Sequence, residues 1–348
     1  MYEFRVDKFL GDGSFSTVFG AISRRGEDVG QSYALKRFHG QDDESVKCAL
    51  REHHILTRVA METEHATFLP TLFYGFVLDK SPILVVSEGS GFDLSDVLVE
   101  YFPLNVEDAI FYCSEIICGL EYLHSLGIVH MDIKPENILL TKSGHVMIAD
   151  FDSSYDMIYG NRPPQPEDFK GTIQYMAPEV ENKCHISFKS DIWSLATTLA
   201  RMLFGFIHPN SPLDQISDRE WIDRGFKQFR EPLQAFFAAC LQLDPDERPS
   251  IMEIKRLKLF RNVNWNNSAL LNQPPPYQVS RISRGMGTIR QNTHPRDQQI
   301  LRKLWKGELD FTVDIRSHLH PHQNEAVDGE VDVLLSHFYF VNCKVSCI

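Results

Sequence analysis

The strongest constraint on this chain is a dense polar run, His130-Met-Asp-Ile-Lys-Pro-Glu-Asn137, near its middle. The run follows Val106–Leu126, whose apolar residues recur at helical spacing. Asp132 can orient a hydroxyl group and accept its proton. Lys134 can neutralise a phosphoryl group in transfer, and Asn137 can offer an amide oxygen to a hard cation. The run therefore predicts a loop that supports phosphoryl transfer.

A further carboxylate follows this run in the sequence Ala149-Asp-Phe-Asp152. Asp150 comes 18 residues after Asp132. A protein site for Mg²⁺ commonly uses one or two carboxylates together with the phosphates of the substrate. Asn137 and Asp150 are therefore the predicted metal ligands, for Mg²⁺ or alternatively Mn²⁺.

A glycine-rich turn, Gly11-Asp-Gly-Ser-Phe-Ser-Thr-Val18, lies between two strand-like segments near the start of the chain, Arg5–Leu10 and Val18–Ser23. Glycine lets the backbone approach phosphate groups and present its N–H groups to them. A tight hairpin without a ligand explains the same residues equally well. No Gly-Lys-Ser/Thr sequence follows, so the turn is not a Walker A loop.

A lysine and a glutamate follow the turn in two different predicted elements. Lys36 lies in the strand-like segment Ser32–Phe38, and Glu52 lies in Ser45–Ala60, which has helical spacing of its apolar residues. An ion pair between these side chains can hold the lysine head over two phosphates. A solvated strand lysine is the simpler alternative. A short buried strand is also expected at Ile83–Val86.

In this order and at this spacing, the motifs resemble a eukaryotic protein kinase of the serine/threonine type. The resemblance covers residues 1–260 and continues through four more segments: Gly171-Thr172, Ala177-Pro-Glu179, Asp191-Ile-Trp-Ser194 and Asp246-Glu-Arg-Pro249. It implies a buried ion pair between Glu179 and Arg248, and an Asp191 that supports the catalytic loop from beneath.

The resemblance implies an α/β fold in two lobes, with ATP and Mg²⁺ between them. The small lobe is expected at 1–86, the hinge at about 87–92 and the large lobe at 93–260. Asp132 and Lys134 are the implied catalytic residues. The implied ATP-binding residues are Gly11, Asp12, Gly13, Ser14, Phe15, Ser16, Val18, Ala34, Lys36, Glu52, Ser87, Gly89 and Asp93.

The segment 261–348 resembles the C-terminal extension of AGC kinases, and the glycine-rich turn is similar to that of the phosphoinositide-dependent kinase branch. Phe260–Trp265 and Pro274-Pro-Pro-Tyr277 match the start of such an extension. Leu335-Ser-His-Phe-Tyr-Phe-Val-Asn342 is similar to its hydrophobic motif, although a terminal amphipathic strand is an alternative. The resemblance implies that this tail docks on the small lobe of its own chain.

Three of the positions that depart from the family pattern bear on the activity and its regulation. Met131 replaces an arginine that, in the family, binds a phosphate group on the activation loop. Asp168 occupies the position in this loop that is usually phosphorylated. Both changes predict an activity that does not need phosphorylation of this loop. Asp152 replaces the glycine of Asp-Phe-Gly, which tolerates unusual backbone angles, and adds a charge near the metal ligands.

The overall charge and composition narrow the class of protein. The formal net charge is −12, which argues against nucleic acid as a partner because phosphate binding needs a basic face. No apolar run approaches the length of a membrane span, which argues against stable membrane insertion. Seven cysteines without a Cys-x-x-Cys pair indicate reduced thiols and a cytoplasmic protein with access to the nucleus.

Three functions remain open at this point. The first is a protein kinase that acts on serine and threonine. The second is a pseudokinase scaffold that keeps the fold, binds nucleotide weakly or not at all, and acts through protein partners. The complete set Lys36, Glu52, Asp132, Asn137 and Asp150 favours an enzyme. The third, a kinase of small molecules, leaves Gly171–Glu179 unexplained.

Overall fold

The computed structural model describes residues 3–26, 28–39, 43–62, 66–78, 80–159, 163–205, 230–282, 312–314, 338 and 340–341. The chain divides into two compact units. Unit 1 comprises Met1–Ala66, Pro70–Gly91 and Arg284–Ile348, and unit 2 comprises Thr67–Leu69 and Phe92–Ser283. Unit 1 is built around an antiparallel sheet and unit 2 is mostly helical, which confirms the predicted α/β fold with two lobes.

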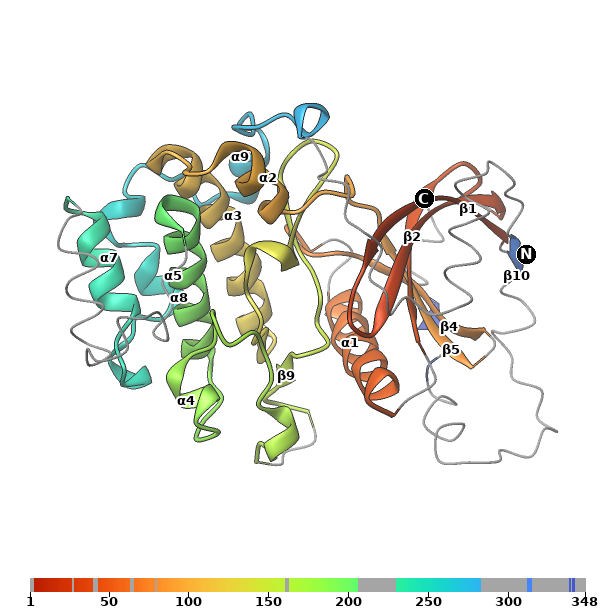
Figure 1. The fold of residues 1–348 in the computed structure, drawn as a ribbon, viewed down its shortest axis with the longest axis horizontal. Coiled ribbons are helices and arrows are strands. Elements are labelled where there is room, and N and C mark those ends of the chain that lie inside the picture. The colour runs from red at the N-terminus through yellow and green to blue at the C-terminus, as the bar shows by residue number, and fades with distance from the viewer. Residues whose placement is uncertain are drawn as a thin grey trace. The chain divides into compact units, whose positions relative to one another are not determined.

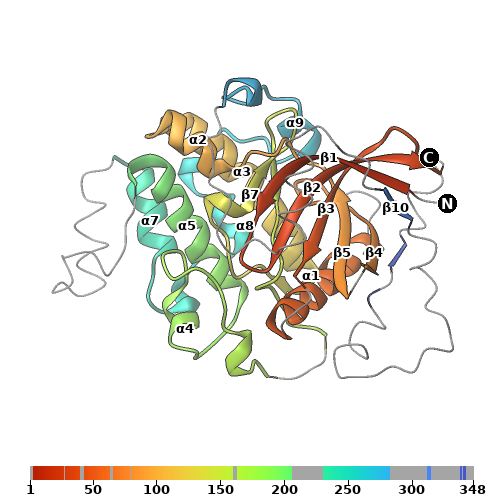
Figure 2. The same cartoon turned by 45° about the vertical axis from the view of Figure 1, so that its right-hand side comes forward.

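Unit 1 contains a sheet with seven described strands, all paired antiparallel. Along the chain the strands are β1 (Glu3–Asp12), β2 (Ser16–Arg25), β3 (Ser32–Phe38), β4 (Leu72–Leu78), β5 (Ser81–Ser87), β10 (Thr312–Asp314) and β11 (Phe340–Val341). Their spatial order is β10-β1-β2-β3-β5-β4-β11, and Figure 2 shows the central five side by side.

One face of this sheet carries an apolar cluster of unit 1. Phe4, Phe19, Leu35, Phe76 and Val85 alternate with residues of the opposite face and are each 3% exposed or less. Alternation along a strand sends successive side chains to opposite faces, so a strand that buries one face must place apolar residues at every second position. The same alternation brings Lys36 to the other face, away from this cluster.

Helix α1 (Asp43–Glu62) is the one long helix in the described part of unit 1. Two acidic residues, Asp43 and Glu44, occupy its first turn, where they complement the helix dipole. Its buried residues recur at intervals of three and four and include Val46, Ala49 and Ile55. Glu52 lies on this buried stripe, which is an unusual place for a carboxylate without a partner.

Both outer strands of the sheet come from the C-terminal segment. β10 pairs with β1 through Glu3–Arg5, and β11 pairs with β4 through Tyr74 and Gly75. Unpaired strand edges expose N–H and C=O groups, and pairing satisfies them. Leu335–His337, Tyr339 and Asn342 of the expected hydrophobic motif lie outside the described residues, whereas Phe338 is fully buried.

Unit 2 is built on helices, of which α3 and α5 are the longest described, and Figure 1 shows these two helices near its centre. The helices are α2 (Leu94–Tyr101), α3 (Val106–Ser125), α4 (Pro178–Glu181), α5 (Phe188–Phe204), α7 (Leu233–Cys240), α8 (Ile251–Ile254) and α9 (Asn267–Leu271). Short 3-10 turns occur at Pro135–Asn137, Pro166–Asp168, Pro245–Glu247, Lys258–Phe260 and Val279–Arg281. Two small antiparallel pairs join β6 (Ile128–Val129) to β9 (Tyr155–Asp156), and β7 (Ile138–Leu140) to β8 (Val146–Ile148).

The first part of the predicted C-terminal extension packs on unit 2 rather than unit 1. The Tyr277 hydroxyl donates a hydrogen bond to Asp108 at 2.6 Å, and its ring stacks on Tyr101 with centroids 4.3 Å apart. Trp265 lies against Phe260, with centroids 5.7 Å apart. The segment after residue 260 therefore contributes described structure to both units.

Most predicted elements are present, and β4 is the main omission. The expected helices at Ser45–Ala60 and Val106–Leu126 correspond to α1 and α3. The motif Asp191-Ile-Trp-Ser194 lies in α5, which begins at Phe188 because Ser187 caps it by accepting a hydrogen bond from the Lys189 N–H. Among the helices that the structure describes, none has the length and apolar character to cross a membrane.

Candidate active site

The polar run found in the sequence forms a loop that α5 holds from below. Asp191 is fully buried, and its carboxylate accepts hydrogen bonds from the N–H groups of His130 and Met131, each at 2.9 Å. His124 Nε2 lies 2.9 Å from the same carboxylate. Met131 has φ = 72°, so a side chain with a Cβ adopts the left-handed region here. These contacts confirm that Asp191 supports the loop.

Asp132 is the centre of the polar cluster in unit 2. It is 6% exposed, and its Oδ2 accepts hydrogen bonds from Lys134 Nζ at 2.7 Å and from Asn137 Nδ2 at 2.9 Å. Its Oδ1 accepts from the Thr172 N–H at 2.7 Å. Three donors on one carboxylate fix its orientation. The structure thus assembles both predicted catalytic residues into one group.

Thr172 connects this cluster to the segment before α4. Lys134 Nζ donates to Thr172 Oγ1 at 2.6 Å, in addition to its bond with Asp132. Gly171 makes the approach possible: its φ is +135°, and a Cβ at this position would lie 2.6 Å from the Met131 carbonyl oxygen. In the sequence Thr172 is recognisable only as part of the Gly171-Thr172 motif, and this bond was not predicted.

Asn137 and Asp150, the predicted metal ligands, lie on adjoining segments. Asn137 Nδ2 donates to both the backbone oxygen and Oδ2 of Asp132, at 2.8 and 2.9 Å. This orientation leaves the Asn137 amide oxygen to face away from Asp132. The Ala149 N–H donates to the Asn137 carbonyl at 2.9 Å, and Asp150 follows with φ = 69°. An amide oxygen and a carboxylate are hard donors, so these residues fit Mg²⁺ or Mn²⁺.

Lys36 and Glu52 form the expected ion pair in unit 1. Lys36 Nζ lies 2.6 Å from Glu52 Oε2, and the two side chains are 13% and 5% exposed. Lys36 Nζ also lies 5.2 Å from the centre of the Phe38 ring. The ion pair explains why a carboxylate is tolerated on the buried stripe of α1. It holds the lysine head on the face of the sheet opposite the cluster that contains Phe4 and Phe76.

The glycine-rich turn is an ordered hairpin between β1 and β2. The Gly13 N–H donates to the Ser16 carbonyl at 2.8 Å, and the Thr17 hydroxyl donates to Asp12 Oδ1 at 2.9 Å. The Phe15 carbonyl accepts from the His39 N–H at 2.9 Å. Ser14 is exposed. Both hypotheses, a tight hairpin without a ligand and a phosphate-binding turn, predict this geometry.

The remaining predicted nucleotide-binding residues of unit 1 follow the register of the sheet. Val18 pairs with Lys36, and Ala34 pairs with Val86. A Cβ built at Gly11 meets no described atom within 4 Å, so no such contact requires glycine at this position. Cross-strand partners share a face, so Val18 and Ala34 lie on the same face as Lys36.

The expected hinge begins at the end of β5. The Ser87 N–H donates to the Thr71 carbonyl, and Ser87 Oγ accepts from the Thr71 N–H, both at 3.0 Å. Gly89 lies in the segment that follows β5, before unit 1 ends at Gly91. The Ser87 N–H is therefore used within unit 1, and the Ser87 carbonyl and Gly89 remain as candidates for contact with a base.

Asp93, the last predicted nucleotide-binding residue, caps α2. Its Oδ1 accepts from the Asp96 N–H at 3.0 Å and from the Ser95 hydroxyl at 2.6 Å. Burial raises the pKa of Asp93 to about 6, because the charged form loses water. Asp93 thus has a structural role as the N-cap of α2, which was not predicted from the sequence.

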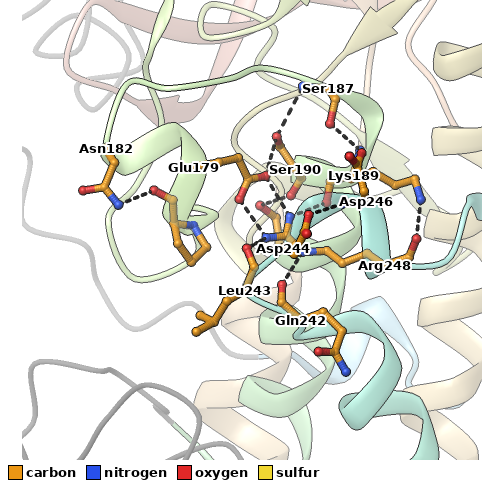
Figure 3. A network of polar contacts seen from close by, with 12 residues as sticks. Glu179, Asn182, Ser187, Lys189, Ser190, Gln242, Leu243, Asp244, Asp246 and Arg248 are labelled. Carbon is orange, nitrogen blue, oxygen red and sulfur yellow. Dashed lines mark hydrogen bonds and ion pairs between the residues drawn. The ribbon is translucent and has the colours of Figure 1, made fainter.

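Glu179 and Arg248 form the buried ion pair that the resemblance implies (Figure 3). Arg248 Nη1 and Nη2 donate to the two carboxylate oxygens of Glu179, each at 2.7 Å. Arg248 is 1% exposed, and its Nε also donates to the Gln242 carbonyl at 2.7 Å. Ser190 Oγ donates to Glu179 Oε1 at 3.1 Å. The pair joins α4 to the residue that ends the 3-10 turn Pro245–Glu247, and it lies outside the cluster around Asp132.

The sequence matches the protein kinase domain family over residues 4–260. The chain belongs to the protein kinase family. Curated relatives include 3-phosphoinositide-dependent protein kinase 1 of Arabidopsis thaliana, which is 31% identical over 301 residues. Ribosomal protein S6 kinase alpha-2 of Homo sapiens is 32% identical over 285 residues. Each alignment covers 79% of this chain, but only 58% and 38% of these two relatives.

Two features of this kinase fold were not expected from the sequence. Thr172 shares Lys134 with Asp132, and an ion pair joins Lys8 to Glu88 at 2.7 Å. The bond between Lys134 and Thr172 could have been suspected from the sequence, because Thr172 follows Gly171 directly. No local signal points to the second, since 80 residues separate its partners.

Proposed function

We propose that this protein kinase transfers the γ-phosphoryl group of ATP to serine or threonine hydroxyls of proteins. The observation that supports the proposal is the arrangement around Asp132, whose carboxylate is oriented by three donors while Lys134 also binds Thr172. Oriented groups of this kind lower the barrier because they need little rearrangement during the reaction.

Each side chain of the cluster has a chemical role in this proposal. Bound Mg²⁺ screens the charge of the phosphates. The substrate hydroxyl oxygen attacks the γ-phosphorus, its proton passes toward Asp132 Oδ1, and the bond to the bridging oxygen breaks to release ADP. Lys134 stabilises negative charge on the phosphoryl oxygens. Asn137 and Asp150 supply oxygen donors that hold the cation.

Unit 1 supplies the nucleotide-binding groups in this proposal. Lys36, held by Glu52 at 2.6 Å, presents a cation to the α- and β-phosphates. The Ser87 carbonyl and Gly89 contact the adenine, and Val18 and Ala34 provide apolar contact with the base. The protein substrates, and the predicted location in the cytoplasm with access to the nucleus, remain predictions.

The test is phosphoryl transfer from labelled ATP to generic peptides with Mg²⁺ or Mn²⁺, comparing the wild type with Asp132→Asn. The wild type is expected to produce phosphoserine or phosphothreonine, and the variant is expected to lose about a thousandfold or more of this rate. A matched control is Asp108→Asn, far from Asp132 in the chain, which keeps a partner for the Tyr277 hydroxyl.

A pseudokinase scaffold is the alternative function. It would show no transfer from any acceptor, whether or not nucleotide raises the melting temperature. Transfer that continues unchanged in Asp132→Asn would instead contradict the role given to Asp132. The two results separate a wrong function from a wrong catalytic residue.

We also propose that activity does not depend on phosphorylation between Asp150 and Glu179. Asp168 is 5% exposed, and its carboxylate accepts from the Gln165 N–H at 2.8 Å within a short 3-10 turn. Met131, where the family pattern has arginine, is 3% exposed and offers no charge for a phosphate. Protein treated with phosphatase should keep full activity; an activating phosphosite mapped in this segment would refute the proposal.

We further propose that the C-terminal tail docks on the small lobe of its own chain. Phe338 is fully buried, its ring stacks on His53 of α1 at 4.5 Å between centroids, and β11 continues the sheet beyond β4. Burial lowers the pKa of His53 to about 4, so this histidine presents a neutral ring to Phe338.

The tail contact is tested with Phe338→Ala, which should destabilise the protein by about 3–5 kcal/mol, while Phe338→Leu should cost about half as much. Docking within one chain predicts a melting temperature that is unchanged over about a hundredfold range of protein concentration. A melting temperature that rises with concentration would indicate exchange of tails between two chains.

A further inference from the structure

An ion pair joins the first strand of the sheet to the segment that follows β5. Lys8 Nζ of β1 lies 2.7 Å from Glu88 Oε1. The Lys8 side chain is 45% exposed, whereas that of Glu88 is only 3% exposed. A carboxylate so deeply buried is costly without a countercharge. Lys8 supplies this charge from a different part of unit 1.

Gly20 of β2 makes room for this ion pair. The β1–β2 register places Gly20 opposite Lys8, and the β2–β3 register places Gly20 opposite Ala34. A Cβ at Gly20 would lie 2.6 Å from both Cγ and Cε of Lys8, and 3.1 Å from Glu88 Oε1. Gly20 does not have a positive φ, so its backbone conformation does not require glycine. The passage of the Lys8 side chain gives the physical reason for a glycine here.

The ion pair lies on the same face of the sheet as the Lys36 side chain. Cross-strand partners share a face, and residues two apart on a strand return to it. Gly20 is two residues from Val18, the partner of Lys36, and Gly20 itself pairs with Ala34. The apolar cluster that contains Phe4 and Phe76 occupies the opposite face. The Lys8–Glu88 pair therefore borders the surface that carries the predicted nucleotide-binding residues of unit 1.

We propose that Lys8 and Glu88 are positioning residues for nucleotide binding. This inference rests on the proposed kinase function. The pair ties β1, which leads directly into the glycine-rich turn, to the Ser87–Gly89 segment that we assign to the adenine. With both segments held in the free protein, less conformational freedom is lost when an adenine nucleotide binds. Gly20 acts by leaving the path between them open.

The first experiment measures the dissociation constant of Mg²⁺·ADP by calorimetry for the full chain and its variants. Lys8→Met keeps the apolar stem but removes the charge, and Gly20→Ala keeps both charges but obstructs their approach. Each is expected to weaken binding about fivefold, and the double variant no further, because both remove one contact.

The matched control is Arg25→Met, which breaks an ion pair between β1 and β2. Arg25 Nε lies 2.8 Å from Glu3 Oε2, with side chains 61% and 22% exposed. This pair joins neighbouring strands away from the glycine-rich turn, so its loss should leave the dissociation constant unchanged. Equal weakening in the control would refute a specific role for Lys8.

The second experiment measures backbone hydrogen exchange without nucleotide. Lys8→Met and Gly20→Ala should both speed exchange in Phe9–Ser16 and Ser87–Gly91, with Arg25→Met as the control. Unchanged exchange in these two segments would overturn the proposal. If the wild type binds ADP and the two variants bind it equally well, the inference fails while the kinase function stands. A wild type that binds no nucleotide would count against the proposed kinase function and against the positioning role of Lys8 and Glu88. In that case the exchange data would still show whether the Lys8–Glu88 ion pair holds the two segments.

Discussion

The ion pair between Glu179 and Arg248 allows a quantitative prediction about stability. Arg248 is 1% exposed and forms two short hydrogen bonds to Glu179, so truncation leaves a carboxylate with little access to water. Removing one partner of a buried pair typically costs about 3–5 kcal/mol. The Gln242 carbonyl also loses the donor that Arg248 Nε provides at 2.7 Å. We therefore expect Arg248→Met to reach the upper part of this range.

The assay is equilibrium unfolding in urea, followed by tryptophan fluorescence and circular dichroism. In thermal unfolding of a domain of this size, the same loss of about 4 kcal/mol lowers the melting temperature by about 10 °C. Arg25→Met, which breaks the exposed pair with Glu3, should cost less than about 1 kcal/mol under the same conditions.

A double variant tests the physical reason for the large effect. Glu179→Gln with Arg248→Met removes both charges, so no buried charge remains without a partner. If the penalty arises mainly from such a charge, the double variant is more stable than Arg248→Met alone. The reasoning would be refuted if Arg248→Met cost no more than the Arg25→Met control, or if the two single penalties simply added.

Three further predictions address other contacts. Thr172→Val should lower kcat about tenfold, with Thr172→Ser close to the wild type, because only the valine removes the acceptor for Lys134; steady-state kinetics measure this. Gly171→Ala should destabilise the fold by about 2 kcal/mol more than Gly30→Ala in urea unfolding. Both alanines would have an unfavourable positive φ, but only the Cβ at position 171 would also collide with the Met131 carbonyl oxygen, whereas a Cβ at Gly30 meets nothing within 4 Å. The pKa of Asp93 is raised to about 6 in the folded protein, so the folded state binds more protons than the unfolded state between about pH 4 and 6. The stability that protonated Asp93 contributes is therefore fully present below about pH 4 and is lost as the pH rises through about 6. Asp93→Asn should remove this part of the pH dependence of unfolding; an unchanged profile would exclude Asp93 as its source.

Local sequence was sufficient for most individual elements of this protein. Helices α1 and α3 were predictable because their apolar residues recur at a period that only a helix can bury on one side. The spacing within His130–Asn137 was informative because the residues are near neighbours in the chain. Asp132, Lys134 and Asn137 meet through a single turn of backbone.

Contacts between distant segments were less accessible to sequence reasoning. Strand β4 was not predicted, since only its pairing with β5 and β11 distinguishes Leu72–Leu78 from other apolar runs. Asp93 was assigned to ligand binding on the family pattern, and its role as a cap became visible only with the Asp96 N–H in place. The hinge hydrogen bonds of Ser87 likewise depend on Thr71, 16 residues away.

Sequence alone was enough to predict the family, the two-lobed fold and the residue types of the loop His130–Asn137. These properties depend on residue types at short, regular spacing, where backbone geometry alone sets which side chains meet. Tertiary structure decided the Lys8–Glu88 tie across Gly20 and the tail strands at both edges of the sheet. Such contacts depend on which strands become neighbours and on their register. The neighbours and the register of the strands depend on burial of the whole apolar face of the sheet, to which all strands contribute, so they cannot be deduced from one segment alone.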